Sequence, residues 1–161
     1  MALKIDTSKI MVRFAYHSDW DGAMKLAWET FIKFDAPDYS QEGIQNFRNF
    51  VNDEMLRKMF LAGHYQLIVA VDEGRIVGML SLRDKKHISL LFVNEFYHFN
   101  GVGSALIRYA SKYARNEEGL ERLTVNASPY AVNFYKKRGF RARGPETEED
   151  GIRFTPMEIR I

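Results

Sequence analysis

Two closely spaced glycines, Gly101 and Gly103, are the residues of this sequence whose type and spacing first suggest chemistry. They lie in the segment HFNGVG (98–103), between an apolar run that ends at Val93 and a stretch with helical periodicity. The first amides of a helix have no partners inside it, and they lie at the positive end of the helix dipole. Without Cβ atoms, a phosphate can approach these amides closely. The segment indicates either a phosphate-binding loop or a tight turn, and these residues alone leave both open.

Several familiar kinds of site do not fit the sequence. A Walker loop requires a lysine after its last glycine, whereas Gly103 is followed by Ser104, and a Rossmann fingerprint requires a third glycine. The chain has no cysteine, which excludes disulfides, thiolate zinc sites and a thiol nucleophile. The four histidines, at positions 17, 64, 87 and 98, lack the spacing of metal ligands. We therefore expect no metal.

A second candidate group lies in the segment LTVNASPYAVNFYKKRGF (123–140). Ser128 and the proline after it suit the N-cap and the first position of a short helix over 129–138. This helix carries Phe134 and Tyr135. A tyrosine hydroxyl, whose ordinary pKa is about 10, can donate a proton to a leaving group. From this pair of residues alone, a core tyrosine with its hydroxyl at the rim is the favoured interpretation.

Hydrophobic periodicity predicts the elements that position these residues. We expect strands over 10–15, 122–127 and 152–161, three strands within 65–93 divided at 72–74 and 84–86, a short strand at FRAR (140–143), and helices after residue 19 and over 44–60, 101–118 and 129–138. This order predicts an α/β (α+β) fold with a mixed, mostly antiparallel sheet covered by helices on both faces. The helix over 101–118 would connect two parallel strands. No linker divides the chain, so we expect a single domain over 1–161.

Charge and hydropathy exclude several classes of protein. The 161 residues carry a formal net charge of +2 with acids and bases interspersed, which is not the pattern of a dedicated nucleic-acid binder. The apolar runs are too short to span a bilayer. The N-terminal segment MALKIDTSKIMVRF contains no apolar core of signal-peptide length. We therefore expect a cytoplasmic protein without nucleic-acid or membrane partners.

Taken together, HFNGVG (98–103) and FYKKRGF (134–140) resemble the GNAT superfamily of acyl-CoA-dependent N-acetyltransferases. The loop of that family is Gln/Arg-x-x-Gly-x-Gly/Ala after a strand that ends in valine. Its second block ends in an aromatic residue, Tyr, three residues and Gly-Phe. The segment MVRFAYHSDWDGAMKLAWETF resembles the family's first strand and helix, so the likeness covers nearly the whole chain. Two positions depart from the pattern, His98 in place of Gln/Arg and Ser128 where many relatives have Asn.

The resemblance implies a GNAT fold of about seven strands and about four helices, with acetyl-CoA held between two strands that splay apart. Pantetheine would pair with the backbone of Leu91 and Val93, and the amide of Leu91 could polarise the thioester carbonyl. Ser128 would bind pantetheine or only cap its helix. The pyrophosphate would bind the loop and the first turn of the helix, which comprise His98, Phe99, Asn100, Gly101, Val102, Gly103 and Ser104. A side chain at position 103 would then occupy the place of the phosphate.

The resemblance also bears on the reacting groups. It makes Tyr135 the favoured proton donor to the CoA thiolate. His87 lies where some relatives carry a catalytic glutamate, so it is either a general base or a residue at the end of a strand. Glu95 is a weaker candidate, and water can carry the proton instead. Lys136, Lys137 and Arg138 would reach the 3′-phosphate of CoA or form a solvated helix face.

The acceptor pocket of this family is built from the first two helices and their connection. Here that region contains Trp28, Phe31, Asp35 and Tyr39, together with Phe34 and Asp38. Aromatic and acidic side chains suit a cationic amine with an apolar body. Core aromatics beside a solvated acidic loop remain the alternative.

These implications predict an acetyltransferase that moves an acetyl group from acetyl-CoA to a primary amine. Direct attack in a ternary complex is expected, since the chain has no thiol for a covalent intermediate. The alternative is a non-catalytic sensor of the same fold that binds acyl-CoA. The sequence does not identify the amine, and a homodimer paired through the closing strands stays open.

Overall fold

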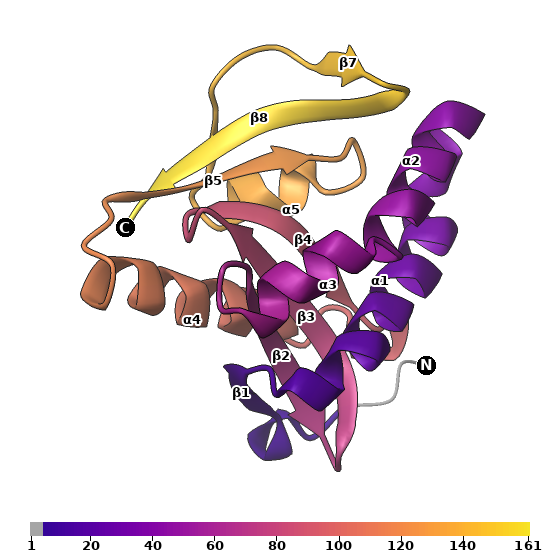
Figure 1. Ribbon diagram of the computed structural model, residues 1–161. Helices are drawn as coiled ribbons and strands as arrows, with labels where there is room; N and C mark the ends of the chain where they lie inside the picture. The colour runs from indigo at the N-terminus through magenta and orange to yellow at the C-terminus, as the bar shows by residue number, and fades with distance from the viewer. Residues whose placement is uncertain (1–4) are drawn as a thin grey trace.

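Eight strands form one mixed sheet in the computed structural model, which describes residues 5–161 (Figure 1). The strand order is β1-β2-β3-β4-β5-β8-β6, and β7 pairs with β8 outside this path. All neighbours are antiparallel except β4 and β5, which are parallel. The strands are β1 (Met11–Phe14), β2 (Gln66–Asp72), β3 (Arg75–Arg83), β4 (His87–Val93), β5 (Arg122–Ala127), β6 (Arg141–Ala142), β7 (Thr147–Glu149) and β8 (Ile152–Arg160). The predicted fold class is confirmed.

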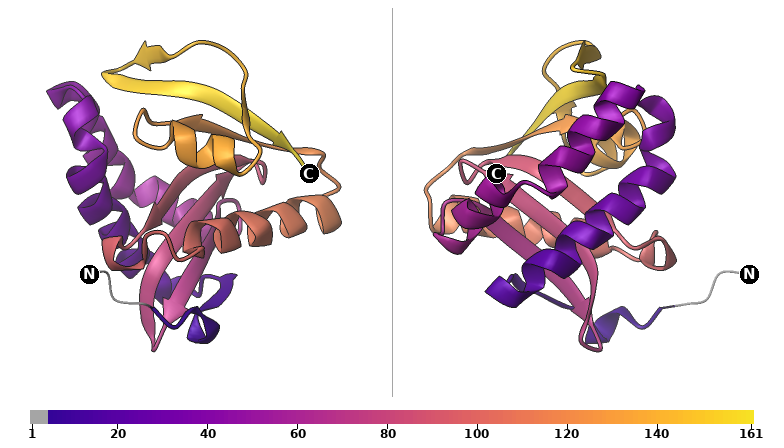
Figure 2. Two further views of the ribbon diagram at one scale, coloured as in Figure 1. Left: turned by 180° about the vertical axis from the view of Figure 1, so that it is seen from behind. Right: turned by 45° about the vertical axis from the view of Figure 1, so that its right-hand side comes forward.

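Helices cover both faces of this sheet (Figure 2). One buried cluster packs α1 (Trp20–Phe34), α2 (Gln41–Val51) and α3 (Glu54–Leu61) against one face. A second cluster packs α4 (Val102–Asn116) and α5 (Val132–Lys137) against the other. The α4 residues at three- and four-residue steps supply the buried side of that helix, as the periodicity predicted. Strands β2, β3 and β4 therefore have a layer of helices on each face.

The turn between β2 and β3 explains why the predicted hairpin forms. Asp72 pairs with Arg75 across a turn in which Glu73 and Gly74 both have positive φ, of 49° and 78°. Such a turn matches the twist of the two strands that it joins. The three strands expected within 65–93 are β2, β3 and β4.

Three predicted elements differ from the structure. The helix expected over 44–60 is interrupted after Val51, because the Asp53 side chain accepts a hydrogen bond from the amide of Met55 and starts α3. The helix expected over 129–138 begins at Val132, since the residues before it form a turn on the carbonyl of Ser128. The strand expected at FRAR shortens to β6, and the unpredicted β7 pairs with β8.

The part of the chain that the structure describes contains no helix long and apolar enough to cross a membrane. The first four residues of the N-terminal segment, for which we expect no export signal, lie outside the described residues.

Candidate active site

Strands β4 and β5 pair only at their first residues, and this divergence shapes the candidate site. The ladder pairs are His87 with Thr124 and Ile88 with Val125. Within the described chain no further pair joins the two strands, although both continue. Strand β3 pairs with the other edge of β4 along most of its length. The backbone of β4 beyond Ile88 therefore presents an unpaired edge on the side of β5.

Two backbone groups of β4 face this unpaired edge, those of Leu91 and Val93. The N–H of Asn94 donates a hydrogen bond of 2.8 Å to the carbonyl of Val77 in β3. In an antiparallel ladder, both polar groups of one residue face the partner strand and those of the next residue face away. Since Asn94 faces β3, Val93 and Leu91 face the opposite side. Their N–H groups are available to a ligand that adds to the edge of β4.

The side chain of His98 fixes the loop that follows β4. Its Nε2 donates a hydrogen bond of 2.7 Å to the carbonyl of Val93, and its ring lies 5.1 Å from the ring of Phe34. A carbonyl can only accept, so Nε2 carries the proton. The imidazole is thus engaged by the protein itself, and its contact with a phosphate stays a prediction.

The N-terminus of α4 has the features of an anion site. Gly101 is its N-cap with φ of +79°, and no side chain caps the helix anywhere in the described residues. The first turn contains no acidic residue. The amide of Ala105 is the first to bond back within the helix, to the carbonyl of Gly101. The preceding amides of the turn therefore have no partner in the helix and lie at the positive end of its dipole.

Gly103 is required for packing as well as for access to the loop. A Cβ atom at this position would lie 2.8 Å from Cζ and 3.0 Å from Cε1 of Phe134. The expectation that a side chain at position 103 would displace only a phosphate is therefore wrong, because it would also displace this ring of α5. Gly101, by contrast, has open space around it, so its positive φ is what requires glycine there.

Arg138, directly after α5, brings a cation to the first turn of α4. Its Nε donates a hydrogen bond of 2.9 Å to Oγ of Ser104, and its Nη1 donates one of 3.0 Å to the carbonyl of Phe134. The guanidinium carbon lies 3.8 Å from the centroid of the Phe134 ring. These contacts leave the guanidinium beside the free amides of α4. The sequence left Arg138 between a ligand contact and a solvated helix face, and the fold places it at the loop.

Tyr135 lies in the core with only 4% of its surface exposed. Its ring packs edge-on against Phe134 and Phe140, at centroid distances of 5.2 and 5.1 Å. We find no hydrogen bond to its hydroxyl within residues 5–161. Burial raises the pKa of this hydroxyl above its ordinary value, and the nearby charge of Asp35 raises it further. The phenol therefore keeps its proton and can serve as a donor.

Asp35 is the one charged side chain among the buried residues of the described chain, with 8% of its surface exposed. It lies at the C-cap of α1, and Oγ of Ser128 donates a hydrogen bond of 3.0 Å to its Oδ1. Burial raises the pKa of this carboxyl to about 6, although the bond from Ser128 lowers it. Ser128 thus does not cap α5, whose N-cap is Ala131. Its role in binding pantetheine stays a prediction.

Aromatic contacts connect three of the residues expected to line the acceptor pocket. The ring of Tyr39 packs against Phe31 at 5.0 Å, and the charges of Asp35 and Asp38 help burial to raise the pKa of Tyr39. Phe31 is buried. The ring of Trp28 stacks on that of Phe31 at 6.1 Å, and Trp28 also lines a cavity of about 470 Å³ between α1, α2 and α3. The charge of Asp35 acts on the hydroxyls of both Tyr39 and Tyr135, and the role of these residues and of Trp28 in acceptor binding stays a prediction.

His87 lies where β4 and β5 are still paired. A hydrogen bond of 2.8 Å joins its Nδ1 to Oγ1 of Thr124 in the paired strand. Burial lowers the pKa of this imidazole to about 4, and the charge of Arg83 adds to the shift. The ring is therefore neutral at pH 7 but a weak base. Its catalytic role stays a prediction.

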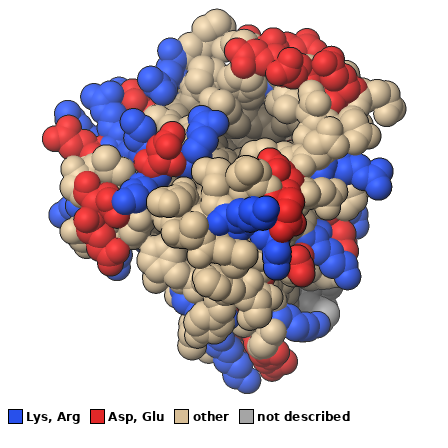
Figure 3. All heavy atoms as spheres, in the orientation of Figure 1, with Lys and Arg blue, Asp and Glu red and all other residues tan. Residues whose placement is uncertain are grey.

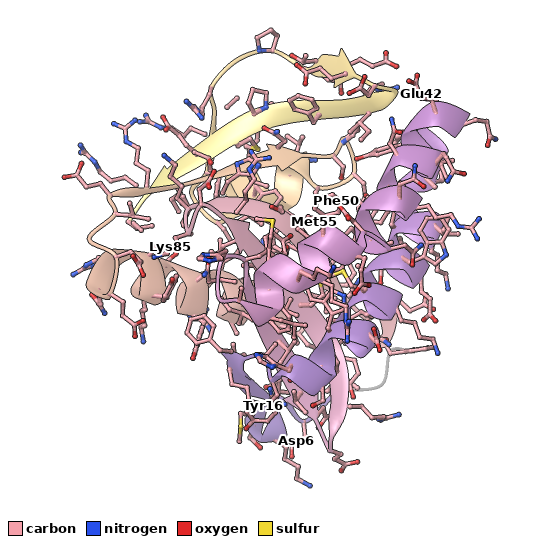
Figure 4. All side chains as sticks on the ribbon, in the orientation of Figure 1. Asp6, Tyr16, Glu42, Phe50, Met55 and Lys85 are labelled. Carbon is pink, nitrogen blue, oxygen red and sulfur yellow. The ribbon has the colours of Figure 1, made fainter. Side chains whose placement is uncertain are left out.

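The N-terminus of α2 is held against the turn between β7 and β8. The amide of Ser40 donates to the carbonyl of Gly151, and Nδ2 of Asn46 donates to the carbonyl of Asp150. Figure 4 shows Glu42 at this end of α2, beside the turn. Figure 3 shows acidic side chains gathered over the turn, next to a hollow between β8 and α2. The connection between α1 and α2 is thus anchored at both ends, to Ser128 and to this turn.

Comparison with protein families gives one match to most of the chain. Residues 35–161 match the family model described as the acetyltransferase (GNAT) domain. Elongator complex protein 3 of Bos taurus is 29% identical over 122 residues. That match covers 73% of this chain but only 20% of the relative, so the chain corresponds to a small part of that protein.

Solved structures share the fold along almost the whole chain. A GCN5-related N-acetyltransferase from Rhodopseudomonas palustris superimposes with a TM-score of 0.82 and 27% identity, over 98% of this chain and 99% of that one. The PaiA N-acetyltransferase from Thermoplasma acidophilum, solved in complex with coenzyme A, gives a TM-score of 0.77 at 19% identity. That match covers 94% of this chain and 99% of the other.

Proposed function

This chain belongs to the GNAT family of acetyltransferases, and we propose that it transfers an acetyl group from acetyl-CoA to a primary amine. The observation that carries this proposal is the divergence of β4 from β5 beside the uncapped N-terminus of α4. It leaves backbone donors on the edge of β4 and free amides at the start of α4. A long thioester that ends in a pyrophosphate requires both kinds of group. When bound, it supplies the activated acyl group.

The residues present fit such a substrate. The N–H groups of Leu91 and Val93 can pair with pantetheine amides, and the amide of Leu91 can polarise the thioester carbonyl. The loop Phe99–Ser104 offers amides to the pyrophosphate. Arg138 adds a positive charge at the same turn, through its bond to Ser104. We propose that this guanidinium contacts the pyrophosphate of CoA rather than its 3′-phosphate.

Tyr135 is the proposed donor to the sulfur. Its buried hydroxyl has a raised pKa, so it holds a proton at neutral pH. It can therefore donate a hydrogen bond to a thiolate as the carbon–sulfur bond breaks. A charge that develops late in the reaction is stabilised more in the transition state than in the bound substrate.

A thiol-release assay with acetyl-CoA tests the proposal directly. The panel of acceptors is spermidine, tyramine, phenethylamine, L-lysine amide and kanamycin. We expect release of CoA with at least one of them, and intersecting initial-rate plots, as direct attack in a ternary complex requires. Acetyl-CoA alone should raise the melting temperature, because it binds the native state. Stabilisation by acetyl-CoA without acetylation of any amine would favour the sensor of the same fold.

A further inference from the structure

Asp35 occupies a position that is unfavourable for a structural carboxylate. It is buried, and it lies at the C-terminal end of α1, where the helix dipole is negative. No salt bridge to it is found in residues 5–161, and Ser128 supplies its hydrogen bond. The nearest cation of its own helix, Lys33, is paired with Glu95. Buried charges are ordinarily paired, so a bound cation would supply the partner that the Asp35 carboxylate lacks.

Asp35 is also joined, through Ser128, to the segment that carries the proposed donor to the sulfur. Ser128 directly follows β5, at the end where β4 and β5 diverge, and the turn from Ser128 leads into α5 with Tyr135. The charge of Asp35 is felt by the hydroxyls of both Tyr39 and Tyr135. The other charged group that acts on Asp35 is Asp38, which has the same sign. A cation that enters this group of residues therefore meets acceptors and phenols, with Asp35 as its carboxylate.

We propose that Asp35 binds the ammonium group of the acceptor and takes its first proton, with Ser128 as the residue that positions the carboxylate. This inference rests on the proposed function and assigns a catalytic residue to it. A carboxylate whose surroundings bring its pKa near neutral pH suits a general base. His87 is less suited, because its ring is bonded to Thr124 at the paired end of the strands.

The proton and electron balance is complete. The ammonium passes one proton to Asp35, and the nitrogen lone pair forms a bond to the acyl carbon. The carbon–sulfur bond breaks, its electron pair stays on sulfur, and Tyr135 donates its proton to that sulfur. The second nitrogen proton returns through solvent to Tyr135, and Asp35 releases its proton to solvent. The sum is an ammonium and an acetyl thioester converted to an amide, a thiol and one proton.

Protonation of Asp35 makes Tyr135 a better proton donor. The negative charge of Asp35 raises the pKa of Tyr135. When Asp35 takes the proton of the amine, that charge disappears and the Tyr135 hydroxyl becomes a stronger acid. Deprotonation of the nucleophile thereby prepares the donor for the leaving group.

The test compares pH profiles of kcat/KM for the fastest amine of the panel above. The unmodified protein should show an acidic limb with an inflection near pH 6. Asp35→Asn keeps an acceptor for Ser128 but cannot take a proton. We expect kcat/KM to fall by about 10² or more and the limb to disappear. Asp21→Asn, the same change in the exposed first turn of α1, should leave the profile unchanged.

Ser128→Ala gives a readout that a merely structural role would not move. Removing the bond that lowers the pKa of Asp35 should move the acidic limb to higher pH, with activity retained above it. A ¹³C-carboxyl NMR titration of the ligand-free protein, assigned with Asp35→Asn, should show the same upward shift. Addition of the amine without acetyl-CoA should lower that midpoint, because a nearby cation favours the carboxylate.

The outcomes are distinct. A rate for Asp35→Asn within about threefold of the unmodified protein at every pH would overturn the role of Asp35 while the proposed function stands. A limb that survives in Asp35→Asn and vanishes in His87→Ala would assign the base to His87. If Asp35→Asn does not fold, the shift of the acidic limb in Ser128→Ala decides. Absence of acetylation by the unmodified protein would overturn the proposed function, and this role with it.

Discussion

The hydroxyl of Tyr135 is the side-chain group on which the proposed transfer depends most directly. Tyr135→Phe keeps the ring that packs against Phe134 and Phe140 and removes the donor alone. We expect kcat to fall roughly 10-fold or more, since proton donors contribute about 10² to 10⁴. Affinity for acetyl-CoA, measured by calorimetry, should change less than about threefold, because the sulfur carries no charge before reaction. A parallel loss of affinity would make Tyr135 a wall of the binding site.

Arg138 allows a second test at the scale of one residue. Its guanidinium is bonded to Ser104 at the first turn of α4, so Arg138→Gln should weaken binding of CoA about 10-fold, the loss of one charge-assisted contact. The loss should be the same with dephospho-CoA, which keeps the pyrophosphate. Lys112→Gln, at an exposed position of α4, is the control. If only CoA and not dephospho-CoA is weakened, Arg138 instead contacts the 3′-phosphate.

Two glycines allow α2 to pack closely against the turn between β7 and β8. A Cβ atom at Gly43 would collide with the carbonyl of Gly151, and one at Gly151 would collide with Oγ of Ser40. The missing side chains let the two backbones approach closely. This contact anchors the segment that carries Asp35 and Tyr39.

Gly43→Ala should therefore loosen that segment. We expect a loss of stability of about 1–3 kcal/mol, the usual cost of overpacking, and a higher KM for the amine. Chemical denaturation and steady-state kinetics measure the two effects. Gly144→Ala is a matched control in the same region, where the new Cβ atom would meet Pro156 at an ordinary 3.7 Å. An unchanged KM in Gly43→Ala would show that the anchor does not shape the acceptor site.

At the scale of the whole molecule, the buried charge of Asp35 makes stability depend on pH. Its pKa rises from an ordinary 3.8 to about 6 on folding, so the native state binds more protons than the unfolded state between these values. Stability from this group is therefore full below about pH 4 and is lost as the pH rises through 6. The ionised carboxylate of Asp35 therefore costs the fold stability at neutral pH.

Asp35→Asn should remove that cost. At pH 8 we expect the variant to be more stable by about 2–3 kcal/mol, because the pKa of the carboxyl differs between 3.8 in the unfolded state and about 6 in the folded state. Below about pH 3 the two proteins should be equally stable, because the carboxyl is then mostly neutral in both states. Urea denaturation across this range measures the difference. Equal stability at pH 8 would mean that the ionised carboxylate is not destabilised by burial.

Features that depend on residues close together in the chain could be predicted from the sequence. The hairpin at 72–74, the strands around it and the N-terminus of α4 follow from periodicity and from glycines that need positive φ. The family was identifiable because the segments HFNGVG (98–103) and FYKKRGF (134–140) both follow its pattern, in the same order along the chain. Local rules also explain one failure, since the Asp53 cap that starts α3 interrupts a periodicity that continues through it.

Which of these residues contact one another depends on the tertiary fold. Asp35 and Ser128 are 93 positions apart, and Arg138 and Ser104 are 34 apart. The sequence explains the glycine at position 103 by a phosphate or by a tight turn, and the fold adds its close packing against the ring of Phe134. No local pattern encodes such pairs, because side-chain contacts between distant segments depend on how the helices pack on the sheet. The burial that raises the pKa of Asp35 arises in the same way, from elements that come together only when the chain folds.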